Sequence, residues 1–78
     1  MCENALRFII AKIEELPIAD KQEVLEFLKH DEGGIAFEII CDTLEKNSIK
    51  VHTDIYSLIN DIGTKMDMPS ALWEKLKF

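Results

Sequence analysis

The chain has 78 residues, of which 47% are hydrophobic, and carries a formal net charge of −6. A chain of this length buries only about 60% of the surface that its unfolded form exposes, which predicts one domain over residues 1–78 and leaves little protein to wall a deep catalytic pocket. The negative charge argues against nucleic acid and anionic membranes as partners, since both are polyanions, and no stretch approaches the roughly 20 apolar residues of a membrane span.

The first predicted helix covers about residues 3–16 and ends before Pro17, because the residue before a proline is pushed away from helical angles. Its apolar residues recur every three or four positions, which is the period of one helix face. That stripe contains Leu6, Ile9, Ile13 and Leu16, and it is widened by Phe8 and Ile10.

A second helix is predicted from Asp20, which can act as its N-cap with Glu23 in the capping-box position. It should end near His30, and the Gly33-Gly34 pair is expected to form the following turn because glycine tolerates positive φ. The apolar face of this helix is formed by Val24, Leu25, Phe27 and Leu28.

A third helix is predicted over about residues 34–47. Glu38, Asp42 and Glu45 fall at positions i, i+4 and i+7, which places three carboxylates in one row along a helix. Like charges at this spacing cost a few tenths of a kcal/mol, so the row is either a solvated face or an electrostatic contact surface. The buried stripe of the same helix is expected to contain Phe37, Ile40, Cys41 and Leu44.

Asn47-Ser48 interrupts the helical pattern, and residues 49–51 are expected to be extended. Thr53 is a good N-cap for a fourth helix, in which Gly63 either permits a close crossing or ends the helix early. Pro69 begins a last short helix that carries Trp73, the only tryptophan. The core stripe of the fourth helix is Ile55, Leu58, Ile59, Ile62 and Met66, with Ile40 and Ile59 expected at the centres of their stripes. The predicted fold is all-α, a compact single-domain bundle of four to five helices.

The sequence lacks the usual catalytic and metal-binding motifs: it has no GxSxG, Walker-type loop, HExxH or CxxC. His30 and His52 are not spaced like zinc ligands, and Cys41 lies on a predicted buried stripe, away from any base that would activate it. We therefore expect a protein that is not an enzyme and needs no metal or cofactor.

The two cysteines are Cys2, near the terminus, and Cys41. The N-terminal segment is amphipathic and unlike a secretory signal. These features predict a cytoplasmic protein with both thiols free, since reducing compartments disfavour disulfides, and a monomer or weak dimer.

From about residue 18 to the end, the chain resembles the MafI-type family of small bacterial immunity proteins. The motifs that carry it include the turn His30-Asp31-Glu32-Gly33-Gly34, followed by Ala36-Phe37-Glu38 and Ile40-Cys41-Asp42-Thr43-Leu44. It then includes Ile49-Lys50-Val51 before a helix with Tyr56, Leu58 and Ile59, and Met66-Asp67-Met68 before the tail with Trp73. Related immunity proteins also accompany contact-dependent growth-inhibition toxins.

This resemblance implies a cytoplasmic inhibitor that binds the C-terminal toxin domain of a delivered effector, often a nuclease. The distribution of charge agrees with such a role. Residues 13–45 contain ten acids and two bases, a net charge of −8, whereas the rest of the chain contains five acids and seven bases, a net charge of +2. A nuclease cleft is basic because its substrate is a polyanion. The alternatives are a solubilising surface, or a helical adaptor or regulatory module with an acidic binding face. The toxin-binding residues predicted from charge and aromatic type are Asp31, Glu32, Glu38, Asp42, Glu45, Tyr56 and Trp73. The two aromatic residues can also be core residues, and for Trp73 the core is the favoured position.

Overall fold

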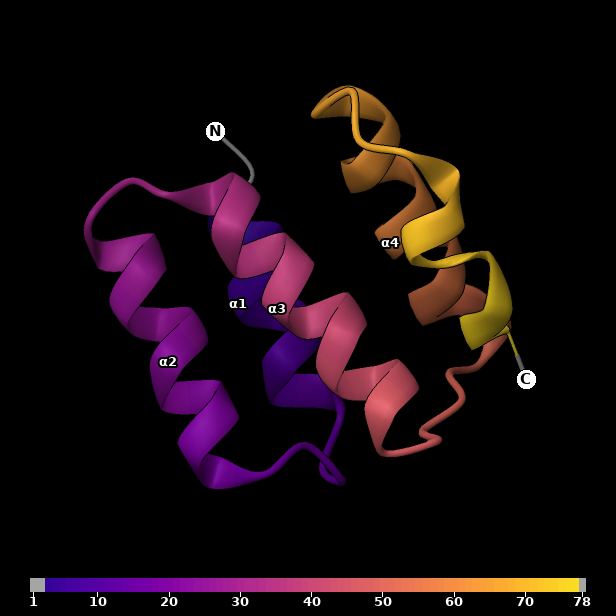
Figure 1. Ribbon diagram of the computed structural model, residues 1–78, viewed down its shortest axis with the longest axis horizontal. Helices are drawn as coiled ribbons and strands as arrows, with labels where there is room; N and C mark the ends of the chain where they lie inside the picture. Colours follow the sequence, from indigo (N-terminus) through magenta and orange to yellow (C-terminus); the bar gives the residue numbers. More distant parts are fainter. Residues whose placement is uncertain (1–2, 78) are drawn as a thin grey trace.

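The computed structural model describes residues 3–77 and shows an all-α fold (Figure 1). Helix α3 lies centrally and contacts α1, α2 and both C-terminal 3-10 turns, η1 and η2, while α4 packs against α1 and η1. Within the described residues, extended structure is confined to one parallel bridge between Val51 and Lys77. The elements are α1 (Glu3–Lys12), α2 (Ile18–Lys29), α3 (Gly33–Lys46), α4 (Thr53–Lys65), η1 (Ser70–Leu72) and η2 (Glu74–Leu76).

The core contains the apolar stripes that the helical period predicts. Ile40 and Ile59, the expected centres of two stripes, are 1% and 0% exposed, and Cys41 is a buried free thiol. Cys2 lies outside the described residues. Parts of three predicted stripes differ. Leu25 and Phe27 on α2 are only half-buried, as are Ile55, Leu58 and Met66 of the predicted fourth stripe. Phe8 is 48% exposed, with the Lys12 ammonium 5.3 Å from its ring centre.

Several predicted helix starts and ends were wrong. Helix α1 ends at Lys12 rather than near residue 16, because Ile13 to Leu16 form a tight turn that still buries both of these residues. Helix α2 begins at Ile18, so Asp20 lies in the first turn and makes no capping hydrogen bond. Helix α4 begins at Thr53, which makes His52 the residue at the cap position, again without a side-chain cap.

The turn before α3 also differs from the prediction. Gly33 and Gly34 open the helix, and the positive φ falls on Asp31 at 61°. The Glu32 amide donates to the carbonyl of Phe27 at 2.8 Å, and the Asp31 amide donates to that of Leu28 at 3.1 Å. These two bonds form a Schellman closure, which satisfies the last carbonyls of α2.

Helices α3 and α4 end in the same way. Ser48 (φ 56°) and Asp67 (φ 58°) take the left-handed position. The following amides, of Ile49 and Met68, donate back across the last turn at 2.8 and 2.9 Å. Non-glycine residues thus hold all three left-handed positions, which costs each of them roughly 1 kcal/mol or more.

The C-terminal segment closes the core. Trp73, between η1 and η2, is 2% exposed and packs edge-on against Phe37 of α3, with ring centres 5.6 Å apart at 73°. Its indole Nε1 donates to the Asn60 side-chain oxygen of α4 at 2.9 Å. Trp73 lies against Gly63, where a Cβ atom would overlap the indole ring. Gly63 therefore allows a close approach between α4 and the tail, and it does not end the helix, which continues to Lys65.

Candidate functional site: the acidic face of helix α3

Helix α3 presents three exposed carboxylates along one side. Glu38, Asp42 and Glu45 are all exposed, while Phe37 and Ile40 on the opposite side are buried. From Glu38 to Glu45 the row spans about 10 Å at 1.5 Å per residue. We call these three residues the acidic row.

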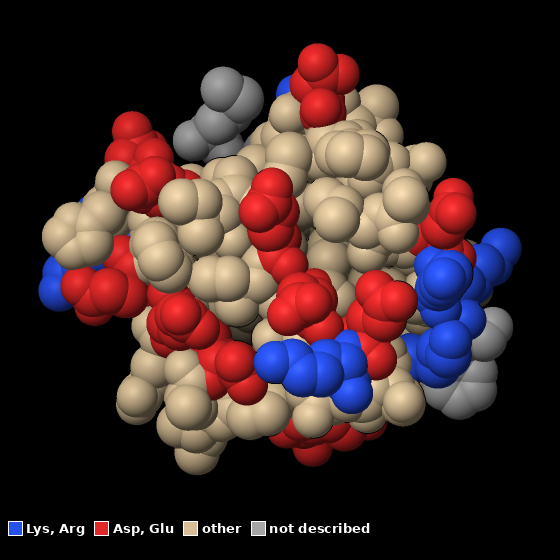
Figure 2. All heavy atoms as spheres, in the orientation of Figure 1, with Lys and Arg blue, Asp and Glu red and all other residues tan. Residues whose placement is uncertain are grey.

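The acidic row is not neutralised by the protein itself. Between described residues, no ion pair includes any of its three carboxylates, whereas Arg7 pairs with Glu3 of its own helix at 2.8 Å. Figure 2 shows acidic side chains over the face that α2 and α3 form, with one basic side chain lying among them and most of the other basic side chains at the edges of the view. The row is therefore a negative surface that remains available to a partner.

Asp31 and Glu32 are both exposed and lie at the N-terminal end of α3. From Glu32 to Glu45 the distance along the helix is about 20 Å. The five predicted acids thus follow the whole length of one helix and do not form a compact cluster.

The two predicted aromatic anchors are not part of this face. Trp73 is buried, so in this conformation its ring is closed to a partner and belongs to the core. Tyr56 is half-buried on α4, with the Lys77 ammonium 5.8 Å from its ring centre. Trp73 supports α3 from inside through Phe37, and neither ring joins the acidic row.

An apolar groove lies beside the acidic row, and sequence reasoning missed it. Ile35 and Ile39 of α3 and Leu72 of η1 line an open surface depression together with Glu38 and Asp42. Ile35 is 40% exposed, and the other two apolar residues are half-buried. The i, i+4 spacing of Ile35 and Ile39, outside the buried stripe of α3, was the signal available in the sequence. The contribution of Leu72 depends on the tertiary fold.

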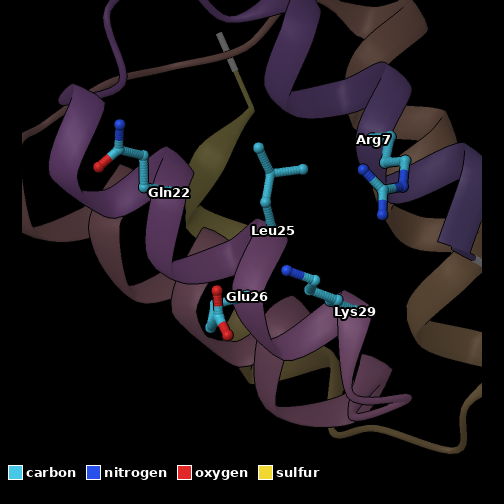
Figure 3. Close-up of a pocket in the computed structure, with 5 residues that line it drawn as sticks. All are labelled: Arg7, Gln22, Leu25, Glu26 and Lys29. Atoms are coloured by element: carbon cyan, nitrogen blue, oxygen red, sulfur yellow. The ribbon is translucent and has the colours of Figure 1, made fainter.

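A second depression lies between α1 and α2 and has mixed charge (Figure 3). Arg7 extends into it from α1, facing Leu25 and Lys29 of α2. Gln22 and Glu26 complete its lining. Because acids, bases and an apolar side chain are interspersed here, this depression has no single charge preference.

The described residues contain no group of three or more His, Cys, Asp or Glu side chains placed to hold a metal ion. Burial raises the pKa of the Cys41 thiol from 9.0 to about 12, and the charges of Glu38 and Glu45 add to this increase. The thiol is therefore protonated at neutral pH and is a poor nucleophile. The arrangement on α3 is suited to binding through charge and apolar contact.

Comparison with models of known protein families, with characterised proteins and with solved structures gives no match.

Over residues 3–77, none of the helices has the length and apolar content needed to cross a membrane.

Proposed function

We propose that this protein is an immunity-type inhibitor, which binds a basic toxin domain through the acidic face of α3 and blocks it without catalysis. The observation that supports the proposal most directly is the acidic row: three exposed carboxylates, one helical turn apart, without an ion-pair partner among the described residues. A row of like charges destabilises its own helix, and a basic partner would offset that cost.

The proposed mechanism is occupation of a basic cleft. A nuclease cleft carries lysine and arginine to hold phosphates, so an acidic helix of similar length can occupy the same surface. Opposite potentials steer the two proteins together and accelerate association by about 10–10³-fold. The cytoplasm of the producing cell is the compartment in which such an inhibitor would act.

The first test is co-expression with the C-terminal domain of a toxin-like protein encoded by a gene that neighbours the gene of this protein. Rescue of growth is the expected result, and a purified one-to-one complex should form. If the domain is toxic and co-expression does not rescue growth, inhibition of that domain is excluded, and the helical adaptor or regulatory module becomes the better hypothesis.

The second test locates the interface. Reversing Glu38, Asp42 and Glu45 to lysine should leave the fold intact, because exposed substitutions usually change stability by no more than about 0.5 kcal/mol each. Association with the toxin domain should slow at least tenfold and lose much of its salt dependence.

A control variant distinguishes the effect of where the acids lie from the effect of the protein's total charge. Glu14, Glu15 and Glu23 are also exposed acids, but they lie in the turn after α1 and on α2. Reversing these three residues changes the net charge by the same amount and should slow association much less. Equal slowing by the two triple variants would show that net charge alone, and not the acidic row, steers binding.

A further inference from the structure

The groove beside the acidic row differs from the other exposed apolar positions. Phe8 lies under the Lys12 ammonium on α1, and Ile18, which begins α2, is 72% exposed and is not among the residues that line the groove. Ile35, in contrast, lines a depression with two further apolar side chains, Ile39 of α3 and Leu72 of η1. An apolar side chain of a partner would therefore have three apolar neighbours in this groove.

The charges beside the groove indicate which partner fits. Glu38 and Asp42 line the same depression and are about 6 Å apart along α3. Lysines at i and i+4 of a partner helix have the same separation. A second copy of this chain fits poorly, because it would bring one acidic row against another in a protein of net charge −6.

We infer that the groove lined by Ile35, Ile39 and Leu72 receives a leucine-sized side chain from a basic amphipathic helix of a partner protein, while lysines of that helix contact Glu38 and Asp42. The inference deepens the proposed function and rests on it in one respect: the helix is expected to belong to the inhibited toxin. The acidic row would then attract the partner helix at a distance, and the apolar contact in the groove would fix the position of that helix along α3.

The probe is a 16-residue alanine-based peptide that repeats the α3 pattern with its charge reversed, carrying leucines at i and i+4 and lysines at i+3 and i+7. It is titrated into the full chain with isotope-labelled isoleucine and leucine methyl groups. Binding should shift the methyl resonances of Ile35, Ile39 and Leu72. A second peptide with both leucines replaced by alanine keeps the charge and should bind about tenfold or more weakly, since each buried methylene contributes about 0.8 kcal/mol.

Two variants of the protein test the groove by changing the protein and keeping the peptide unchanged. Ile35→Ser should weaken binding of the leucine peptide about tenfold and remove most of its advantage over the alanine peptide. Ile18→Ser makes the same chemical change at a more exposed residue outside the groove and should bind like the wild type. Circular dichroism of both variants checks that the fold is retained.

The results separate this inference from the proposed function. Equal affinity for the leucine and alanine peptides, or methyl shifts that avoid the groove, would overturn the groove inference even if the toxin domain is neutralised. Selective binding of the leucine peptide at the groove supports it even if co-expression fails, and the basic helix would then belong to another partner. A dimer that sedimentation detects in the wild type and that Ile35→Ser dissociates would also overturn it, because the occupant would be a second copy.

Discussion

The contact between Gly63 and Trp73 makes the outcome of a Gly63→Ala substitution opposite to what helix propensity predicts. Gly63 lies inside α4, where alanine is favoured over glycine by about 1 kcal/mol. In the folded protein, a Cβ atom at this position would overlap the indole ring of Trp73 and would lie 3.0 Å from Cζ of Phe37.

The indole ring cannot move away cheaply. It is buried, packs edge-on against Phe37, and donates its Nε1 hydrogen to Asn60 at 2.9 Å. Overfilling a packed core by one methyl group typically costs about 1–3 kcal/mol, and weakening the indole hydrogen bond adds about 1 kcal/mol. After the gain in helix propensity is subtracted, Gly63→Ala should destabilise the protein by about 1–3 kcal/mol.

Thermal and urea denaturation followed by circular dichroism measures this effect. In a domain of this size, the midpoint temperature should fall by about 4–8 °C for each kcal/mol lost. Gly34→Ala is the matched control, because a Cβ atom at Gly34 has no neighbour within 4 Å, and it should be neutral or slightly stabilising. If Gly63→Ala is at least as stable as Gly34→Ala, Trp73 does not pack against α4 as described.

Two further predictions concern ionisation and backbone strain. The pKa of Cys41 is about 12 in the folded protein against 9.0 for an ordinary thiol. Between these two values the thiol keeps its proton in the folded state and ionises in the unfolded chain. The free energy of unfolding therefore falls as the pH rises from 9 towards 12. Urea denaturation at pH 7 and pH 10 should show wild type losing about 1.4 kcal/mol relative to Cys41→Ala, and a pH-independent difference would contradict the buried thiol. Ser48→Gly should raise stability by about 0.5–1 kcal/mol, because Ser48 has a φ of 56° that glycine adopts without strain. Ser57→Gly, inside α4, should lower stability by about 0.5 kcal/mol, so a shift of the same sign in both variants would refute the strain at Ser48.

Helix content and the core stripes could be predicted from the sequence because both depend on local periodicity. Residues three or four apart share a helix face whatever lies elsewhere in the chain, which is why Leu6, Ile40, Leu44 and Ile59 were correctly expected in the core. The exposure of the acidic row on α3 followed from the same argument.

Helix ends were less predictable, because a closing turn depends on where the preceding helix stops. The glycine pair at 33–34 was the predicted turn, yet the left-handed position falls on Asp31, directly after the end of α2 at Lys29 and its cap His30. Local residue preferences allowed either arrangement. The Schellman hydrogen bonds to the carbonyls of Phe27 and Leu28 form at the residues where α2 ends, so the place of the turn depends on the place of that helix end.

The tertiary structure alone decided the burial of apolar side chains outside the central stripes. The sequence favoured a core position for Trp73 but also allowed an exposed anchor, and its burial depends on the space beside Gly63. The groove likewise exists because η1 brings Leu72 next to Ile35 and Ile39, which are far from it in sequence. Periodicity assigns each residue to a face of its own helix, but what covers that face depends on contacts between distant segments, and such contacts leave no repeating pattern in the sequence.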